Sequence, residues 1–239
     1  MDWRDRGFVL SARALGERDA VLSLFTREHG RHPGLVRGGA GRRLSPLLQA
    51  GNELHATWRA RLSDHLGAFI LEPGVAHGGA LLDSPRRLAG LSAACATLEV
   101  CLPERESHAR LFDGFEVFLD VLEQDGPWAA LLVRFELELL ADLGFGLDLS
   151  ACAVTGAREG LTHVSPRTGR AVCAAEAAPY ADRLLPLPAF LTGQGEADGP
   201  ALTAGFDLTG HFLERHVLAP HGRGLPAARV RLLSLLGGR

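Results

Sequence analysis

The sequence of 239 residues predicts an α+β protein, in which a five-stranded OB-fold β-barrel is followed by an α-helical domain. Five short strand-like segments with glycine corners occupy about the first 75 residues, and such a series suits a small Greek-key barrel. Long amphipathic patterns follow, interrupted by a loop-rich insertion. We therefore expect an OB-fold domain at residues 1–77 and a helical domain at 78–239, with the insertion at 145–199.

The expected strands end at turn signals. The first, 7–15, lies between two glycines, and the segment 20–39 reads as two strands joined at 28–31, where Gly30 can adopt the positive φ of a tight hairpin. Residues 52–62 alternate in polarity, which predicts a fourth strand. Its apolar face would hold Leu54, Ala56, Trp58 and Ala60. The last strand, 66–73, ends at a Pro-Gly pair.

The expected helices are separated by short Gly/Pro links, which favours an antiparallel bundle. Ser84-Pro85 has the pattern of an N-cap followed by proline at the first helical position. A second helix within 108–126 is predicted by one apolar face. That face holds Leu111, Phe112, Phe115, Phe118, Leu119 and Leu122. A third helix begins at Pro127 and stops at Gly144, and the segments 205–220 and 226–236 are helical again.

Composition indicates a cytosolic protein with enough apolar residues for real cores. Hydrophobic residues make up 46% of the chain, and the longest apolar runs are far shorter than a membrane span. The first six residues are charged and lack the apolar core of a secretory signal. Four cysteines at irregular spacings do not form a disulfide framework.

Charge is unevenly distributed along the chain. Residues 1–61 hold 11 Arg and 6 acids, whereas the remainder holds 14 Arg and 22 acids. The chain contains no Lys, so Arg fills every position that calls for a cation. The positions of the arginines are therefore more informative than their number. An excess of positive charge in the first domain suggests a polyanionic partner.

The segment "LVRGGAGRR" at 35–43 places three arginines, Arg37, Arg42 and Arg43, in a glycine-rich loop. OB barrels bind nucleic acids across one face and its loops, and glycines allow close approach to a phosphate backbone. Arg13, Arg27 and Arg31 are candidates for the same surface; a solvated face is the alternative interpretation. Stacking aromatics are scarce in this domain, with Trp3 and Trp58 beside Phe8 and Phe25, which we assign to the core. We therefore favour the hypothesis that this surface binds the nucleic-acid backbone without reading the bases.

The insertion contains two halves of a zinc-knuckle-like motif, "CAVTG" at 152–156 and "VCAAE" at 172–176. Each half has one cysteine, and Thr155 and Glu176 occupy the positions of the second thiolates. Two thiolates and one carboxylate make a poor tetrahedral zinc site, and the sequence does not place His163 beside them. We expect Cys152 and Cys173 to pack in a knuckle-like loop without a metal, and we expect no cofactor.

Catalytic motifs are missing from the sequence. It contains no G-x-S-x-G, H-E-x-x-H or P-loop pattern, and His211 and His216 are five residues apart, which does not align them on one face of an α-helix. A hydrolase using Cys173 or a histidine is therefore disfavoured, and we expect a protein that is not an enzyme.

Several segments together resemble the bacterial recombination mediator RecO. They are "GFVLSARALGERDAVLSLFTREHGRHPGLVRGG" at 7–39, the tryptophan of "HATWRARL", "LLADLGFGLDLSACAVTG" at 139–156 and "LPAARVRLLSLL" at 225–236. The resemblance covers essentially the whole chain in the same order, and residues 7–39 are its most specific part.

The resemblance implies a non-enzymatic mediator of recombinational DNA repair in the bacterial cytoplasm, associated with the nucleoid during repair. Such proteins bind single- and double-stranded DNA, anneal strands, and work with RecR to load RecA onto DNA coated by the single-stranded DNA-binding protein SSB. The DNA-binding residues map to Arg37, Arg42 and Arg43, and the C-terminal tail of SSB would dock on the helical domain. Arg110 and Arg134 are candidate carboxylate partners for this tail, but they match no motif of the family. The alternative is an adaptor whose barrel binds a protein partner instead of DNA.

Overall fold

The computed structural model describes residues 1–237, and its internal contacts group the chain into two compact units. The first comprises Met1–Gly126 with Pro226–Arg229, and the second comprises Pro127–Leu225 with the chain from Val230. Three helices that follow the barrel in sequence thus belong to the same unit as the barrel. By contacts, the first unit extends well beyond residue 77.

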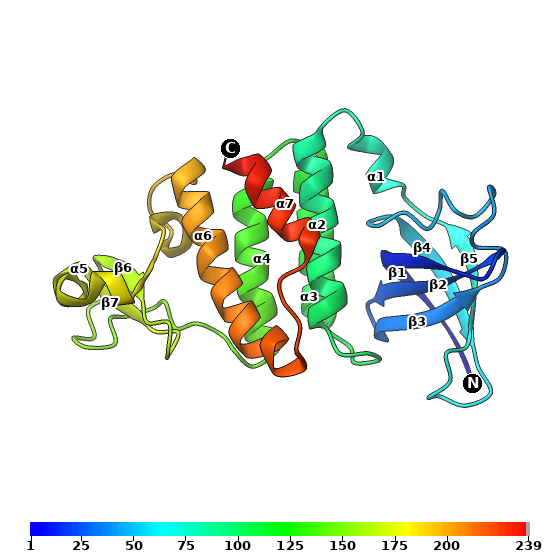
Figure 1. The fold of residues 1–239 in the computed structure, drawn as a ribbon, viewed down its shortest axis with the longest axis horizontal. Helices are drawn as coiled ribbons and strands as arrows, with labels where there is room; N and C mark the ends of the chain where they lie inside the picture. Colours follow the sequence, from blue (N-terminus) through cyan, green and yellow to red (C-terminus); the bar gives the residue numbers. More distant parts are fainter. Residues whose placement is uncertain (238–239) are drawn as a thin grey trace. The chain divides into compact units, whose positions relative to one another are not determined.

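The first unit begins with a closed five-stranded barrel (Figure 1). The strands are β1 (Asp2–Leu15), β2 (Asp19–Thr26), β3 (Gly30–Val36), β4 (Glu53–Arg59) and β5 (Ala68–Pro73). Their order around the barrel is β1-β2-β3-β5-β4, with β3 and β5 parallel at Leu35–Ala68 and the other pairs antiparallel. This is a five-stranded OB-type barrel, and the predicted fold class is confirmed.

Alternation of side chains explains the barrel core. The predicted inward residues of β4, Leu54, Ala56 and Trp58, are all buried, while Ala60 beyond the strand is only partly so. The hairpin between β2 and β3 turns at Gly30, whose φ of +61° is the positive value expected there. Phe8 and Phe25 are buried, as predicted for core residues.

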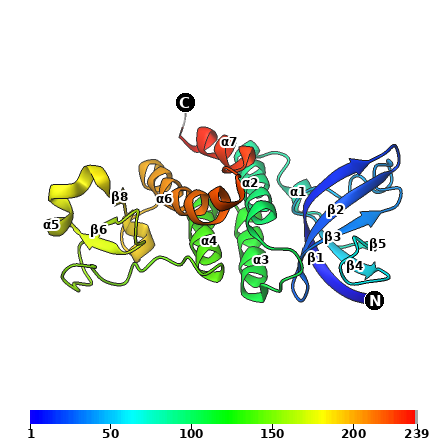
Figure 2. The ribbon, with the colours of Figure 1, turned by 60° about the horizontal axis from the view of Figure 1, so that its bottom comes forward.

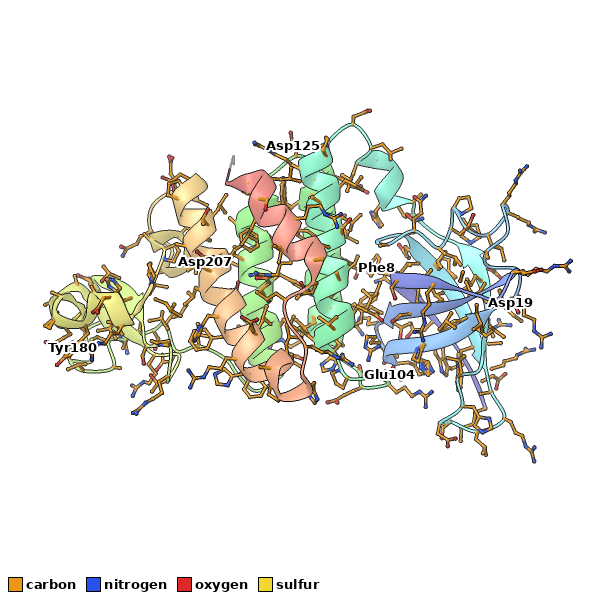
Figure 3. All side chains as sticks on the ribbon, in the orientation of Figure 1. Phe8, Asp19, Glu104, Asp125, Tyr180 and Asp207 are labelled. Carbon is orange, nitrogen blue, oxygen red and sulfur yellow. The ribbon has the colours of Figure 1, made fainter. Side chains whose placement is uncertain are left out.

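Three helices complete the first unit: α1 (His77–Ala80), α2 (Pro85–Cys101) and α3 (Ala109–Glu123). All six residues predicted for the apolar face of α3 are buried. Phe8 lies on the side of the barrel that faces α2 and α3, with ring centroids 5.0 Å from Phe112 and 5.2 Å from Phe115 (Figure 3). Ser84 occupies the N-cap of α2 and Pro85 lies in its first turn, as predicted, although the Ser84 side chain makes no capping hydrogen bond.

The second unit contains the remaining helices and a small sheet. Its α-helices are α4 (Trp128–Asp142), α5 (Ala174–Ala177) and α6 (Gly199–Phe212), and α6 continues into a π-helical stretch, η3 (Leu213–Leu218). The 3₁₀ segments are η1 (Ala178–Arg183), η2 (Ala189–Thr192) and η4 (Ala219–His221). Helix α4 is followed by Gly144 at a φ of +87°, where the sequence predicts its stop. The last helix, α7 (Ala227–Leu236), spans residues assigned to both units.

The predicted insertion at 145–199 is more ordered than a loop-rich segment. It contains a three-stranded antiparallel sheet of β6 (Leu161–Val164), β7 (Ala171–Cys173) and β8 (Leu185–Pro186), in the order β7-β6-β8. Helix α5 lies beside β6 (Figure 2). Strands of two to four residues are too short to give a recognisable alternation in sequence. Within residues 1–237 no helix is both long and apolar enough to cross a membrane.

Candidate nucleic-acid interface

The segment between β3 and β4, residues 37–52, carries the three predicted arginines; we call it the turn segment. It folds as consecutive turns, with backbone hydrogen bonds from Gly39 to Val36, from Gly41 to Gly38 and from Ser45 to Gly41. Leu48 is buried in the barrel core, with Leu44 and Leu47 packed against it. The arginines therefore stand on a backbone anchored to the barrel, whereas the glycine-rich sequence suggested a mobile loop.

Glycines are required where the turn segment leaves β3. Gly38 has a φ of +69°, a left-handed value that side chains disfavour. A Cβ at Gly39 would lie 2.8 Å from Cβ of Ala20 and 3.0 Å from the carbonyl oxygen of Val36. The glycines thus let the chain reverse tightly against β2, which fixes where Arg37 emerges.

Arg37, Arg42 and Arg43 are all exposed. No ion pair or side-chain hydrogen bond to any of them is found within residues 1–237. Guanidinium groups that are charged at every relevant pH and lack a protein partner are available for an external anion. All three arginines of the predicted loop are thus exposed on one segment.

The β1–β2 loop adds positive charge to this surface. The Asp19 carboxylate accepts a 2.8 Å hydrogen bond from the Gly38 amide, and the Arg18 carbonyl accepts one of 3.0 Å from the Ala40 amide. These bonds hold exposed Arg18 beside the turn segment, at the end of the barrel marked by Asp19 in Figure 3. Exposed Arg13 is aligned with Val21 and, on the next strand, Leu35, close to where β3 ends. We call Arg13, Arg18, Arg37, Arg42 and Arg43 the arginine surface; Arg18 was not among the predicted site residues.

A groove of about 490 Å³ lies between the turn segment and β5. Arg37, Arg43 and Arg59 contribute its positive charge, while Leu44, Phe69, Ile70 and Leu71 form its apolar lining. Arg59 is exposed and lies 3.9 Å from the Asp2 carboxylate. A groove with cations beside an apolar lining matches a strand whose phosphates and bases contact protein together.

Two predicted residues, Arg27 and Arg31, do not join the arginine surface. Arg27 makes two hydrogen bonds to Asp113 of α3, at 2.9 and 3.1 Å, and these ionic contacts raise the pKa of its guanidinium. Arg31 donates to the Leu102 carbonyl at 2.8 Å and lies 3.4 Å from Glu104. Their partners follow 71 to 86 residues later in the chain, so local sequence could not reveal them.

The mouth of the barrel contains aromatic rings that the sequence did not bring together. Trp3 stacks on His29 with ring centroids 4.1 Å apart and planes 8° apart, and it lies 5.8 Å from Trp58. His32 fills the space beside them, 4.6 Å from Trp58. The Trp3–Trp58 contact follows from the β1–β4 register, which pairs these two residues across the strands. The composition shows only that aromatic residues are few, and it could not show that these rings lie together.

The knuckle-like residues Cys152 and Cys173 do meet in space. The Cys173 amide donates to Sγ of Cys152 at 3.3 Å, and Oγ1 of Thr155 lies 3.9 Å from Sγ of Cys173. Cys152 belongs to a small apolar cluster with Val172 and Ala177. Hydrogen bonds from the Thr155 side chain, and then from the Cys173 and Thr155 amides, lower the pKa of the Cys152 thiol to about 6.

The residues of this loop do not fit a zinc ion. Two thiols, a threonine hydroxyl and one carboxylate offer too few strong ligands for a tetrahedral structural site. No group of three or more His, Cys, Asp or Glu side chains that could hold a metal is found in the part of the chain described. His163 lies on β6, with Nδ1 2.9 Å from the Thr162 hydroxyl.

The other residues singled out from the sequence are not members of the arginine surface. Arg110 is exposed on α3, and Arg134 on α4 donates to the Phe190 carbonyl. His216 stacks on Phe145 and on Phe212, and burial lowers its pKa, followed by the charges of Arg215 and His211. The π-helical stretch thus keeps His211 and His216 within electrostatic range despite their spacing.

Sequence comparisons decide which family this architecture represents. The model described as "Recombination protein O N terminal" matches residues 1–71, and "Recombination protein O C terminal" matches residues 82–224. The chain belongs to the RecO family. The two matches correspond to the barrel and to the part of the chain from α2 to the end of η4, so the resemblance recognised in the sequence is confirmed.

Relatives named DNA repair protein RecO match over nearly the whole chain. One from Cereibacter sphaeroides is 52% identical over 238 residues, covering 99% of both chains. One from Rhodospirillum rubrum is 51% identical and covers 99% of this chain and 96% of its own, and one from a Caulobacter species is 50% identical with 99% and 98% covered. The RecO fold described here is thus found in proteins named for DNA repair.

Proposed function

We propose that this chain is a non-enzymatic recombination mediator that binds single- and double-stranded DNA through the arginine surface and the adjoining groove. The observation that carries the proposal is the set of Arg37, Arg42 and Arg43, exposed and without protein partners on an anchored segment of an OB barrel. Membership of a family whose members are named for DNA repair supports a DNA phosphate as the anion.

Phosphate contacts suit the strand annealing that the resemblance implies. Guanidinium groups neutralise charge on two strands without reading their bases, and this lets complementary strands approach each other. Tight recognition of many bases would instead block pairing. As in the family it resembles, the chain would work in the cytoplasm with RecR to place RecA on SSB-coated DNA, and the SSB tail would dock on the helical part of the chain.

The adaptor alternative finds less support in the barrel. An extended partner adds to a sheet through an unpaired edge strand. In the part of the chain described here the five strands close into a barrel, and the closure between β3 and β5, at Leu35–Ala68, leaves only short strand edges there. Phosphate binding on the arginine surface needs no edge.

The test is the salt dependence of DNA binding by the full chain, measured by fluorescence anisotropy of a labelled single strand. Loss of three phosphate contacts in an Arg37→Ala, Arg42→Ala, Arg43→Ala variant should reduce the slope of log affinity against log salt by about 2, because each contact on a single strand contributes about 0.7. Duplex affinity should fall as well, since the duplex offers the same phosphates.

The matched control removes three exposed arginines elsewhere, Arg86, Arg158 and Arg167, and so changes net charge equally. Its slope should equal that of the unmodified protein. If the two triple variants behave alike, the assignment of phosphate binding to the arginine surface is wrong. If the unmodified protein binds no DNA at low salt, the proposed function itself is wrong.

A further inference from the structure

The aromatic rings at the mouth of the barrel border a cavity that the phosphate contacts above do not use. This Trp3 cavity has a volume of about 520 Å³, within the range of small-molecule sites. Its walls include Trp3, His29, His32 and Trp58, and its polar residues include Ser63 and Arg105. Flat rings on several sides favour a flat occupant.

The inner wall of the cavity is uncharged. His32 is only 3% exposed, and burial, followed by the positive charges of Arg105, His29 and Arg31, lowers its pKa to about 4. The ring is therefore neutral at pH 7 and can be either donor or acceptor at each nitrogen, depending on the tautomer. A neutral wall does not attract a phosphate, but it suits a heteroaromatic ring.

Two buried polar atoms at this site lack partners among the described residues: Nδ1 of His32 and Nε of Arg105. Buried polar atoms in proteins are nearly always hydrogen-bonded, so this pair indicates that a further polar group belongs here. Arg105 also has a φ of +65°, an uncommon value for a residue with a side chain. Its Nη2 donates to the His65 carbonyl at 2.9 Å, which places the guanidinium at the β4–β5 loop.

The acids at the cavity are already engaged by other groups. Glu28 pairs with Arg27 at 3.1 Å, and Asp2 lies 3.9 Å from Arg59. Asp5 lies 3.1 Å from Nδ1 of His29 and so orients that ring against Trp3. Among residues 1–237, Arg105 thus has no carboxylate paired to it, and the Met1 ammonium, which also lines the cavity, donates to the Ala60 carbonyl at 2.7 Å.

The cavity and the groove share a wall. Phe69 lines the groove, and its ring lies 5.9 Å from Trp3 and 6.3 Å from His32 in edge-on contacts. Trp58 of the cavity and Arg59 of the groove are consecutive on β4. The edge-on contacts of Phe69 thus link the wall of the groove to the rings of the cavity.

We propose that the Trp3 cavity receives one unstacked base of a bound single strand on the face of His29 that Trp3 leaves free, with Trp3 supporting the His29 ring from its other face and Arg105 contacting the phosphate. This inference rests on the proposed DNA binding and adds to it a distinction between strand types. A base in a duplex is stacked and paired on both sides and cannot enter, so the cavity contributes to single strands alone. The arginine surface contributes to both.

The experiment compares three probes of equal length with the full chain: an oligo(dT) strand, a strand of abasic sites with the same phosphates, and a hairpin duplex. The unmodified protein should bind oligo(dT) more tightly than the abasic strand. Trp3→Leu should weaken oligo(dT) binding about 5- to 150-fold, which corresponds to about 1–3 kcal/mol for one stacked base. It should leave abasic and duplex affinities unchanged, and Trp3→Phe should restore most of the loss.

Removal of an exposed aromatic elsewhere, in Tyr180→Leu, provides the control and should change none of the three affinities. If Trp3→Leu does not fold, quenching of tryptophan fluorescence in the unmodified protein by oligo(dT), but not by the abasic strand, provides the same test. Equal binding of oligo(dT) and the abasic strand by the unmodified protein would overturn the cavity proposal while leaving phosphate binding intact. Failure to bind any of the three probes would instead contradict the proposed function.

Discussion

The barrel carries two groups of arginines that differ in what surrounds them. Arg6, Arg27 and Arg31, the helix-facing arginines, are bound by groups of α3 or of the α2–α3 connection: Glu116, Asp113 and the Leu102 carbonyl, respectively. Arg37, Arg42 and Arg43 on the turn segment have no such partners among the described residues. One residue type thus serves assembly of the first unit at one place and remains available to a ligand at another.

This difference shows that an arginine in the sequence indicates a ligand-binding surface only once its partners within the protein are known. Without the three helix-facing arginines, eight arginines remain in residues 1–61, and six of them belong to the arginine surface or the groove; Arg4 and Arg61 do not. The predictions below test the two groups against each other.

The largest effect is expected from the aromatic packing beside the helix-facing arginines. Phe112 is fully buried, with ring centroids 5.0 Å from Phe8 and 5.5 Å from Phe25, and the Arg6 guanidinium lies 5.2 Å from its ring centre. Phe112→Ala should lower the free energy of unfolding by about 3–5 kcal/mol through lost burial and a residual cavity. Urea denaturation measures this loss. A change below about 1 kcal/mol would contradict the described barrel–helix packing.

A comparable effect is expected from pH at His32. Its pKa lies near 4 in the folded protein and near 6.5 when unfolded, so between these values only the unfolded chain binds the proton. This contribution to the free energy of unfolding is complete above pH 6.5 and is lost as the pH falls toward 4, by on the order of 3 kcal/mol. Urea denaturation at pH 7.5 and 4.5 should show a smaller loss in His32→Gln than in the unmodified protein. Equal losses in both would show that His32 titrates normally.

A smaller effect is expected from Arg31. Its side chain is 13% exposed, and its hydrogen bond to the Leu102 carbonyl involves a charged donor. Arg31→Ala should lower the free energy of unfolding by about 1.5–3 kcal/mol and leave the salt slope of DNA binding unchanged. A reduced slope with normal stability would instead place Arg31 among the phosphate contacts.

The smallest change comes from a single-residue comparison of the two groups. Arg42→Ala should reduce the salt slope for a single strand by about 0.7, the contribution of one phosphate contact. Arg27→Ala removes the same charge, but Arg27 is already paired with Asp113. The salt slope of DNA binding should therefore stay the same. Anisotropy titrations at four or more salt concentrations resolve the two. Equal salt slopes in Arg42→Ala and Arg27→Ala would show that the arginine surface and the helix-facing arginines do not differ in phosphate binding.

Much of the fold could be predicted because its signals are local. Alternation in β4, the glycine at the β2–β3 turn and the apolar face of α3 each lie within a few residues, and the structure confirms them. Five short strands with glycine corners predicted the OB-type barrel, which the structure confirms. The short strands of the insertion escaped prediction because two to four residues carry no periodicity.

The candidate site was less predictable because its decisive contacts are distant in sequence. In the sequence, Arg27 and Arg31 look as available to a ligand as Arg37. In the structure, Asp113 binds Arg27 and the Leu102 carbonyl binds Arg31. The Trp3 cavity combines residues of β1, the β2–β3 hairpin, β4 and the segment near Arg105, and only the closed barrel brings these together. Glycines near Arg37 indicated flexibility, whereas the buried Leu48 shows that the segment is anchored.

The hydrogen bond from the Gly38 amide to Asp19 has a consequence for redesign of this surface. Replacing acids by neutral residues is a common way to strengthen polyanion binding, yet here one acid braces the backbone that presents Arg37. Asp19→Ala should weaken binding although the protein becomes more positive, while Glu17→Ala, in the same loop, should strengthen it slightly. The DNA binding proposed for this surface would thus depend on keeping one negative charge in place, although counting charges alone favours its removal.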